Sequence, residues 1–164
     1  MNEASITQYI TSTFDGVDVV VASRDAGSPE IAWGDSFFSY DPGRQLPPAQ
    51  RFPFATIVTK DYGDFDCASQ LNRPGVFRLN IGISKETYRS LFGPQPSPPP
   101  AGSAVETRYD FTALDQLLPH PVYAPMSWVC VLNPSAATFE VVQPLLAEAY
   151  QQAVRRYAKH ETRG

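Results

Sequence analysis

Three aspartates, an arginine and an asparagine lie close together in the chain and could form a polar site. They belong to the stretch "KDYGDFDCASQLNRPGVFRLNIGIS", Lys60–Ser84. Arg78 and Asn80 stand inside an apolar run that is typical of a β-strand. Successive side chains of a strand point to opposite faces, so these two share one face and the neighbouring apolar residues share the other. This polar face contacts either water or a ligand, and the sequence leaves both alternatives open.

The arginine has several candidate partners in the same stretch. Its planar guanidinium matches a carboxylate, whether from Asp61, Asp64 or Asp66 or from an anionic ligand. Asn80 can donate and accept hydrogen bonds at once and could orient a ligand. The sequence therefore predicts that Arg78 and Asn80 line a cleft together with these acids.

The acids "DYGDFD" have a spacing similar to that of a calcium-binding loop. They lack the central glycine and the closing glutamate of an EF-hand, so we predict no metal site. The sequence also contains no phosphate-binding loop, dinucleotide fingerprint, nucleophile elbow or zinc-protease motif. We therefore predict no cofactor.

His120 is the second candidate for chemistry, because histidine exchanges protons near neutral pH. It lies between Pro119 and Pro121, which favour an extended backbone on both sides. Tyr123 and Trp128 follow closely, and this segment could present all three rings to a pocket. The alternative is a structural histidine that is hydrogen-bonded to backbone where two elements meet.

If the protein is an enzyme, His120 is predicted as the acid or base and Arg78 as a clamp for an anion, with Asp61 or Asp66 orienting one of the two. The predicted ligand-binding residues are Arg78, Asn80, Tyr123 and Trp128.

The elements that position these residues follow from periodicity and from turn signals. A helix is predicted from Ser5, through a capping box with Gln8, to Gly16. Further helices are predicted at residues 85–93, where Ser84 is the cap, at 109–118, and from Pro144 onward, with 138–143 as a separate turn. Strands are predicted at 17–22, in two short pieces within 31–41, and at 54–59, 75–83 and 126–133. An extended link is predicted at 119–125.

This order of elements favours an α+β fold. Strands dominate the first half of the chain, without the regular strand–helix alternation of a doubly wound sheet. We predict one domain over residues 1–164, with an antiparallel sheet and helices packed mainly on one face. The proline-rich segment 94–104 is predicted to be an insertion between elements.

Composition limits the classes of function. The chain has 164 residues and a net charge of −4, which argues against nucleic acid as a partner. The N-terminus lacks the pattern of a signal peptide, and no apolar run is long enough for a membrane span. Cys67 and Cys130 are far apart and are predicted to be reduced thiols, with Cys130 buried. We therefore expect a cytoplasmic protein.

The chain resembles a bacterial family that is known only as a domain of unknown function, number 6194. The resemblance covers nearly the whole chain apart from the proline-rich insertion. The segments that carry it are "WGDSFFSYD", "FPFATIVTKDYGDFDCASQLNRPGVFRLNIGIS", "LDQLLPHPVYAPMSWVCVLNPS" and "LLAEAYQQAVRRY".

The order of the segments is also similar, more distantly, to that of the MmcQ/YjbR-like proteins. In both, a strand like "RLNI" leads into a helix, and a tryptophan-containing strand and a terminal helix follow. This second resemblance implies a compact α+β fold that is sometimes compared with double-wing DNA-binding domains. Such a domain should present a basic surface, which this acidic chain does not obviously do. Neither resemblance implies an activity.

Two functions are kept open. The first is a protein that binds a small molecule, such as a binding, resistance or tailoring protein of bacterial secondary metabolism. Its chemistry, if any, would be cofactor-independent proton transfer, cyclisation, isomerisation or hydrolysis. The second is a non-catalytic module that binds protein or nucleic acid. A homodimer is left open.

Overall fold

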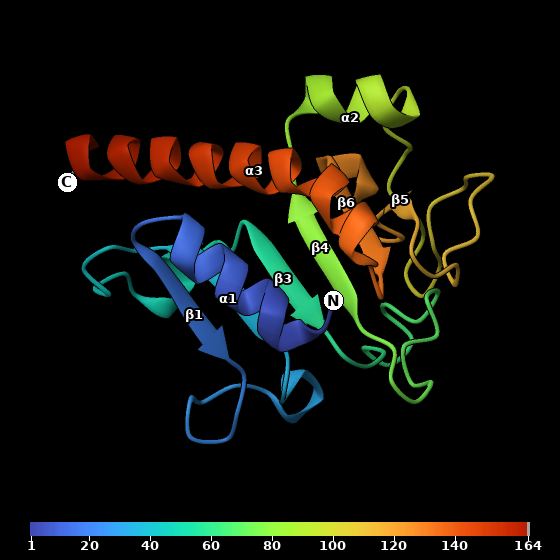
Figure 1. The fold of residues 1–164 in the computed structure, drawn as a ribbon, viewed down its shortest axis with the longest axis horizontal. Coiled ribbons are helices and arrows are strands. Elements are labelled where there is room, and N and C mark those ends of the chain that lie inside the picture. The colour runs from blue at the N-terminus through green and yellow to red at the C-terminus, as the bar shows by residue number, and fades with distance from the viewer. Residues whose placement is uncertain (164) are drawn as a thin grey trace.

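The computed structural model describes residues 1–163, and its centre is one antiparallel sheet. The sheet has six strands in the order β1-β2-β3-β4-β6-β5 (Figure 1). The strands are β1 (Val17–Val21), β2 (Ser36–Tyr40), β3 (Ala55–Val58), β4 (Arg78–Gly82), β5 (Leu117–Pro119) and β6 (Trp128–Leu132). Each neighbouring pair is antiparallel, which confirms the predicted α+β class.

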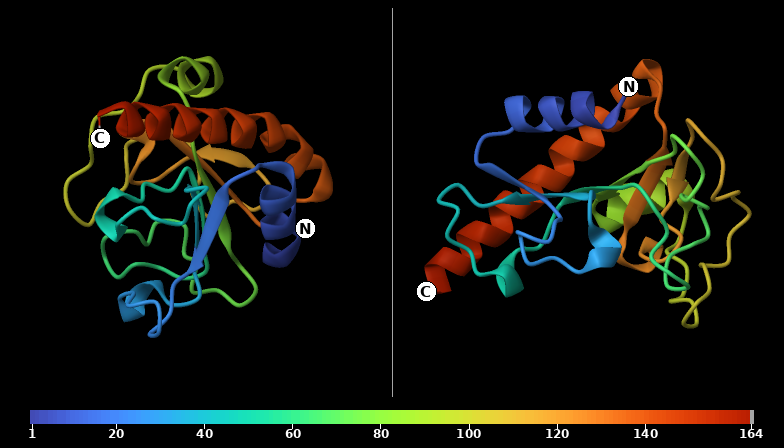
Figure 2. Two further views of the ribbon diagram at one scale, coloured as in Figure 1. Left: turned by 90° about the vertical axis from the view of Figure 1, so that its left-hand side faces the viewer. Right: turned by 90° about the horizontal axis from the view of Figure 1, so that it is seen from below.

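One face of the sheet carries the main hydrophobic core. Two helices, α1 (Glu3–Thr13) and α3 (Ala136–Arg163), pack on this face, and α3 runs obliquely across the sheet (Figure 2). Apolar side chains at alternate strand positions meet them, among them Phe38, Ile57 and Leu79. The predicted packing of helices on one face is therefore found.

The opposite face of the sheet is covered by loops. Leu71, from the long connection between β3 and β4, is buried there against Val58, Leu118 and Cys130. The predicted burial of Cys130 is confirmed. Arg78, Asn80 and Thr56 lie on this face as well, because they occupy alternate positions of their strands.

The predicted helix at 109–118 is wrong. Residues 110–113 form turns, in which the Asp110 carboxylate accepts hydrogen bonds from the backbone N–H and the hydroxyl of Thr112. Aspartate competes with helix formation in this way. Leu117–Pro119 then forms the edge strand β5, and an edge is where a strand tolerates proline.

The predicted extended link at 119–125 is also wrong beyond Pro119. The chain turns at residues 121–123 and continues into a short 3-10 helix, Ala124–Met126. His120 causes the turn, because its Nδ1 accepts hydrogen bonds from the backbone N–H groups of Val122 and Tyr123.

Three other predicted elements differ in detail from the structure. The first helix begins at Glu3, and its capping box joins Asn2 and Ser5 in place of Ser5 and Gln8. Within 31–41 there is one strand, β2, preceded by the 3-10 helix Glu30–Ala32 in place of a first strand piece. The C-terminal helix α3 passes through Pro144 without a break.

Packing explains why α3 continues past the proline. Phe139 and Val142, in the segment predicted as a separate turn, are buried in the main core, and this stabilises the helix before Pro144. The first turns lie at an angle to the rest of α3 (Figure 1), as expected of a helix with an interior proline.

The helix after β4 is as predicted. It is α2 (Lys85–Phe92), with Ser84 as its N-terminal cap and Gly93 at its end. The segment 94–104 contains neither helix nor strand.

A glycine in β4 makes room for a tryptophan in β6. Gly82 and Trp128 are paired across the two strands. A Cβ atom at Gly82 would lie 2.9 Å from the Trp128 indole, closer than van der Waals contact allows. The missing side chain therefore lets the indole lie flat over β4.

We predict that Gly82→Ala displaces the Trp128 ring and lowers the free energy of unfolding by about 1–3 kcal/mol, the usual cost of overpacking. Denaturant unfolding followed by tryptophan fluorescence measures both effects. Gly43→Ala is the control, since a Cβ there lies at ordinary contact distance from Gln45. Unchanged stability and emission in Gly82→Ala would show that the indole has another place to go.

Candidate functional site

The polar residues of β4 are buried in the structure. Arg78 is 0% and Asn80 is 3% exposed. The alternative of a water-exposed polar face is therefore wrong. These side chains must find partners within the protein, because an unpaired buried charge or amide is costly.

Arg78 is paired with Asp66 in a two-point contact. Its two terminal nitrogens lie 3.1 Å and 2.5 Å from the two oxygens of the Asp66 carboxylate. One of them also donates to the Ser69 hydroxyl, at 2.9 Å. Burial alone would lower the pKa of Arg78, but the hydrogen bonds and charge of Asp66 raise it overall. The guanidinium is therefore charged and neutralised in place.

A chain of hydrogen bonds leads from Arg78 to the neighbouring strand. Arg78 Nε donates to Asn80 Oδ1 at 2.8 Å, and Asn80 Nδ2 donates to Thr56 Oγ1 at 3.0 Å. Because a guanidinium can only donate, it fixes the orientation of the Asn80 amide. Thr56 therefore accepts from Asn80, and no acceptor for its own hydroxyl hydrogen is found within residues 1–163.

His120 lies at the other end of this network and is 2% exposed. Its Nδ1 accepts two backbone hydrogen bonds, from Val122 at 3.0 Å and from Tyr123 at 2.9 Å. The proton of the neutral ring is therefore on Nε2. Nε2 is 3.9 Å from Asp66 Oδ2 and 3.3 Å from a terminal nitrogen of Arg78.

The environment keeps His120 uncharged. Burial, and then the nearby positive charge of Arg78, lower the pKa of His120 well below its ordinary value. At neutral pH the ring is a hydrogen-bond donor at Nε2. Its two hydrogen bonds to backbone N–H groups agree with the second alternative from the sequence, a structural histidine where two elements meet.

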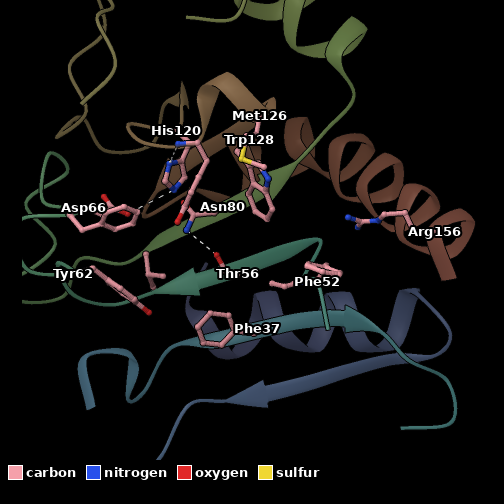
Figure 3. A pocket seen from close by; sticks show the side chains of 14 residues that line it. Phe37, Phe52, Thr56, Tyr62, Asp66, Asn80, His120, Met126, Trp128 and Arg156 are labelled. Carbon is pink, nitrogen blue, oxygen red and sulfur yellow. Dashed lines mark hydrogen bonds and ion pairs between the residues drawn. The ribbon is translucent and has the colours of Figure 1, made fainter. Parts of the chain in front are cut away.

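A cavity of about 450 Å³ opens above these polar residues. Four polar side chains that line it are Thr56, Asp66, Asn80 and His120, and Figure 3 shows how they lie. Six rings line it as well, namely those of Phe37, Phe52, Tyr62, Phe65, Tyr123 and Trp128. Arg156 reaches toward it from α3 (Figure 3). The site thus combines a polar floor, aromatic walls and one cation at its edge.

One aromatic wall is held by a buried acid. The Tyr62 hydroxyl donates to Asp35 Oδ2 at 2.5 Å, and Asp35 is 0% exposed. Asp35 Oδ1 also accepts from the backbone N–H and the hydroxyl of Thr59, both at 2.8 Å. Burial, followed by this hydrogen bond to Asp35, raises the pKa of Tyr62, so the phenol stays neutral.

The rim of the cavity is apolar and partly open to solvent. Phe52, Phe65 and Met126 are 64%, 53% and 69% exposed, and Tyr123 is also exposed. Phe65 and Tyr123 lie near each other on this rim, with ring centroids 6.1 Å apart. Large exposed apolar side chains grouped at an opening are typical of a ligand-binding site.

The predicted site residues are brought together only in part. Asp66, Asn80, His120, Tyr123 and Trp128 all line the cavity. Arg78 does not line it but holds Asp66 and Asn80 in position.

Asp61 is not among the residues that line the cavity. Its carboxylate accepts the backbone N–H of Leu71 at 2.8 Å, and its own N–H donates to Asn72. Asp61 therefore shapes the loop that carries Asp66 and makes no contact with His120 among the described interactions.

Several residues that line the cavity were not predicted from the sequence. Phe37 could have been found, because alternation in β2 places it on the same face as Ser39, opposite Phe38. Phe52, Tyr62 and Phe65 lie in the connections between strands and Met126 ends a short 3-10 helix, so none of them gives a periodic signal. Arg156 lies on α3, far from the other residues in sequence.

Metal-binding side chains and thiols are two further kinds of group that could do chemistry. Among the side chains that the structure describes, no three His, Cys, Asp or Glu residues are placed to hold a metal ion. The Cys130 thiol is fully buried, and burial raises its pKa to about 12. Its sulfur is therefore a weak nucleophile.

Comparison with protein families gives one match. A model described as "Family of unknown function (DUF6194)" matches residues 1–162. The chain belongs to this family. No curated protein and no solved structure matches it, so the similarity to MmcQ/YjbR-like proteins stays a prediction. No helix within residues 1–163 is long and apolar enough to cross a membrane.

We predict that Arg78→Met lowers the free energy of unfolding by about 3–5 kcal/mol, because it leaves the Asp66 charge buried without a partner. The double variant Arg78→Met/Asp66→Leu should recover much of this loss, since an apolar pair of similar volume is often as stable as a buried ion pair. Denaturant unfolding of the four proteins of this cycle measures the coupling.

Arg89→Met is the control for this cycle, because Arg89 is exposed on α2. It should change the stability by no more than about 0.5 kcal/mol. Additive losses in the double variant would contradict a direct coupling between Arg78 and Asp66.

The lowered pKa of His120 predicts a pH dependence of stability. Below pH about 6.5 the unfolded chain takes up a proton on this ring and the folded protein does not. This ring should therefore cost about 1 kcal/mol of stability between pH 7 and pH 5.5. His120→Asn keeps an acceptor near the Nδ1 position and cannot titrate. Its loss of stability over this interval should be smaller than that of the wild type by this amount. Equal losses in the two proteins would contradict a neutral buried imidazole.

Proposed function

We propose that this protein binds a small organic molecule with a planar, mainly apolar body in the cavity between its aromatic walls. The observation that carries the proposal is the cavity itself, of about 450 Å³, in which six rings surround four polar side chains. Ligand sites in proteins have this composition, an apolar lining with a few fixed polar groups.

The polar floor supports recognition over a purely structural role. A buried ion pair contributes little net stability, because desolvating its charges offsets most of their attraction. Apolar residues at Arg78, Asp66 and Asn80 would fill this face of the sheet at least as well. The network instead holds hydrogen-bonding groups at defined positions beside an open cavity.

The direction of the hydrogen bonds suggests what the ligand offers at the floor. Donation runs from Arg78 through Asn80 to Thr56, so the Thr56 hydroxyl has a hydrogen left to donate. Thr56 lines the cavity. An oxygen acceptor on the ligand, such as a carbonyl, would complete the chain.

The geometry favours binding over acid–base catalysis by His120. Its Nδ1 lone pair is used by two backbone N–H groups, and its Nε2 carries the proton. A neutral imidazole in this state neither accepts a proton at Nε2 nor releases one readily. The Asp66 carboxylate is engaged by Arg78 and is not free to act as a base.

Binding is testable with N-phenyl-1-naphthylamine, an uncharged aromatic dye whose emission rises in apolar sites. We expect saturable binding at one site. Of the two tryptophans, Trp128 lies in the cavity wall, so Trp33→Phe leaves it as the only tryptophan. The bound dye should then quench Trp128 emission.

A charge at the rim should weaken this binding without affecting the fold. Met126→Glu places a carboxylate at the mouth, at a side chain that is 69% exposed. Val141→Glu is its control, on α3 outside the cavity and 63% exposed. Failure of the dye to saturate the protein, or an equal loss in both variants, would overturn the proposal.

A further inference from the structure

A second cavity lies beside the first and shares residues with it. It measures about 330 Å³ and is lined by residues of β2, of the connection that follows β2, and of the C-terminal half of α3. Phe52 and Arg156 line both cavities. A molecule that fills the first cavity and extends past Phe52 would therefore pass Arg156.

Apart from Asp66, which is paired with Arg78, the charged side chains that line the two cavities are positive. Among the side chains that the structure describes, Asp66 is the only acid that lines either cavity, and Arg78 neutralises it. Three other ionisable side chains of the first cavity are neutral, namely His120, Tyr62 and Tyr123. Arg156, and in the second cavity Lys159, supply positive charge.

Arg156 has no partner of its own among the described residues. Among the side chains that the structure describes, no hydrogen bond or ion pair of its guanidinium is found. Arg156 is exposed at the junction of the two cavities, and the protein atoms beside it take away part of its water, which lowers the pKa of Arg156. A partly desolvated cation gains more from an anionic partner than one in open water does.

We propose that the ligand is an aromatic or conjugated anion whose carboxylate or sulfonate pairs with Arg156 at the junction of the two cavities. This proposal rests on the proposed function and names the chemical class of the ligand. The apolar body lies between the rings of the first cavity, and the planar guanidinium presents parallel N–H groups to the acid. In a chain with a net charge of −4, this local positive site selects anions against the overall field.

Two dyes with the same ring system test this inference. 8-Anilinonaphthalene-1-sulfonate carries a sulfonate, and N-phenyl-1-naphthylamine is its uncharged counterpart. Arg156→Met should weaken binding of the sulfonate dye by about tenfold or more, the usual effect of losing a charge-assisted hydrogen bond. It should leave binding of the uncharged dye nearly unchanged.

The neighbouring arginine provides a matched control. Arg155 is exposed and lines neither cavity, so Arg155→Met removes the same charge from the same helix. It should affect neither dye by more than about twofold, because Arg155 lines neither cavity and water and salt screen its charge from a ligand there. Salt should weaken binding of the sulfonate dye to the wild type more than to Arg156→Met.

The outcomes separate the two proposals. If the uncharged dye binds and Arg156→Met leaves the sulfonate dye unaffected, the anion inference fails and the cavity stands as a binding site. Equal losses in Arg155→Met and Arg156→Met also overturn the inference, because the effect would then be general electrostatics. If neither dye binds to the wild type, the proposed function fails and the inference fails with it.

Discussion

The buried pair of Arg78 and Asp66 is the interaction on which the site depends. Arg78 stands on a central strand, and Asp66 belongs to the long loop between β3 and β4. Their two-point contact fixes this loop over the sheet, and Arg78 also directs Asn80 toward Thr56. The pair acts together with the hydrogen bond from Tyr62 to Asp35 and the burial of Leu71, which hold the same loop. Arg78 thus positions Asp66 and Asn80, which line the cavity, without lining it itself.

The two faces of the sheet are built on different principles. One face is closed by α1 and α3, whose apolar side chains interlock with those of the strands. The other face is covered by loops, and loops must bring polar backbone groups with them. Acidic side chains satisfy several of these groups: the buried Asp35 accepts from Thr59, and the partly buried Asp61 accepts from Leu71. Because loops do not pack as densely as a helix, this arrangement leaves space for a cavity.

The sequence predicted the sheet and its polar strand better than it predicted the surroundings. Alternation along β4 placed Arg78 and Asn80 on one face, because that rule depends only on neighbouring residues. It could not decide between water and burial, since that depends on a loop whose path is set by long-range contacts such as Arg78 with Asp66. The errors at 109–118 and 119–125 have a related cause. There, side-chain bonds of Asp110 and His120 to nearby backbone form turns that apolar periodicity does not reveal.

The structure gives His120 a different role from the one that its sequence context suggested. Two flanking prolines and a ring that titrates near neutrality suggested a proton carrier. The structure places two backbone N–H groups on Nδ1 and a guanidinium beside Nε2, and both favour the neutral ring. A neutral ring fixed in this way is a rigid wall of the cavity and holds the turn that carries Tyr123. The same residue therefore joins the shape of the cavity to the charge of the buried pair, because burial and then the charge of Arg78 lower the pKa of His120, and its neutral form keeps the turn in place.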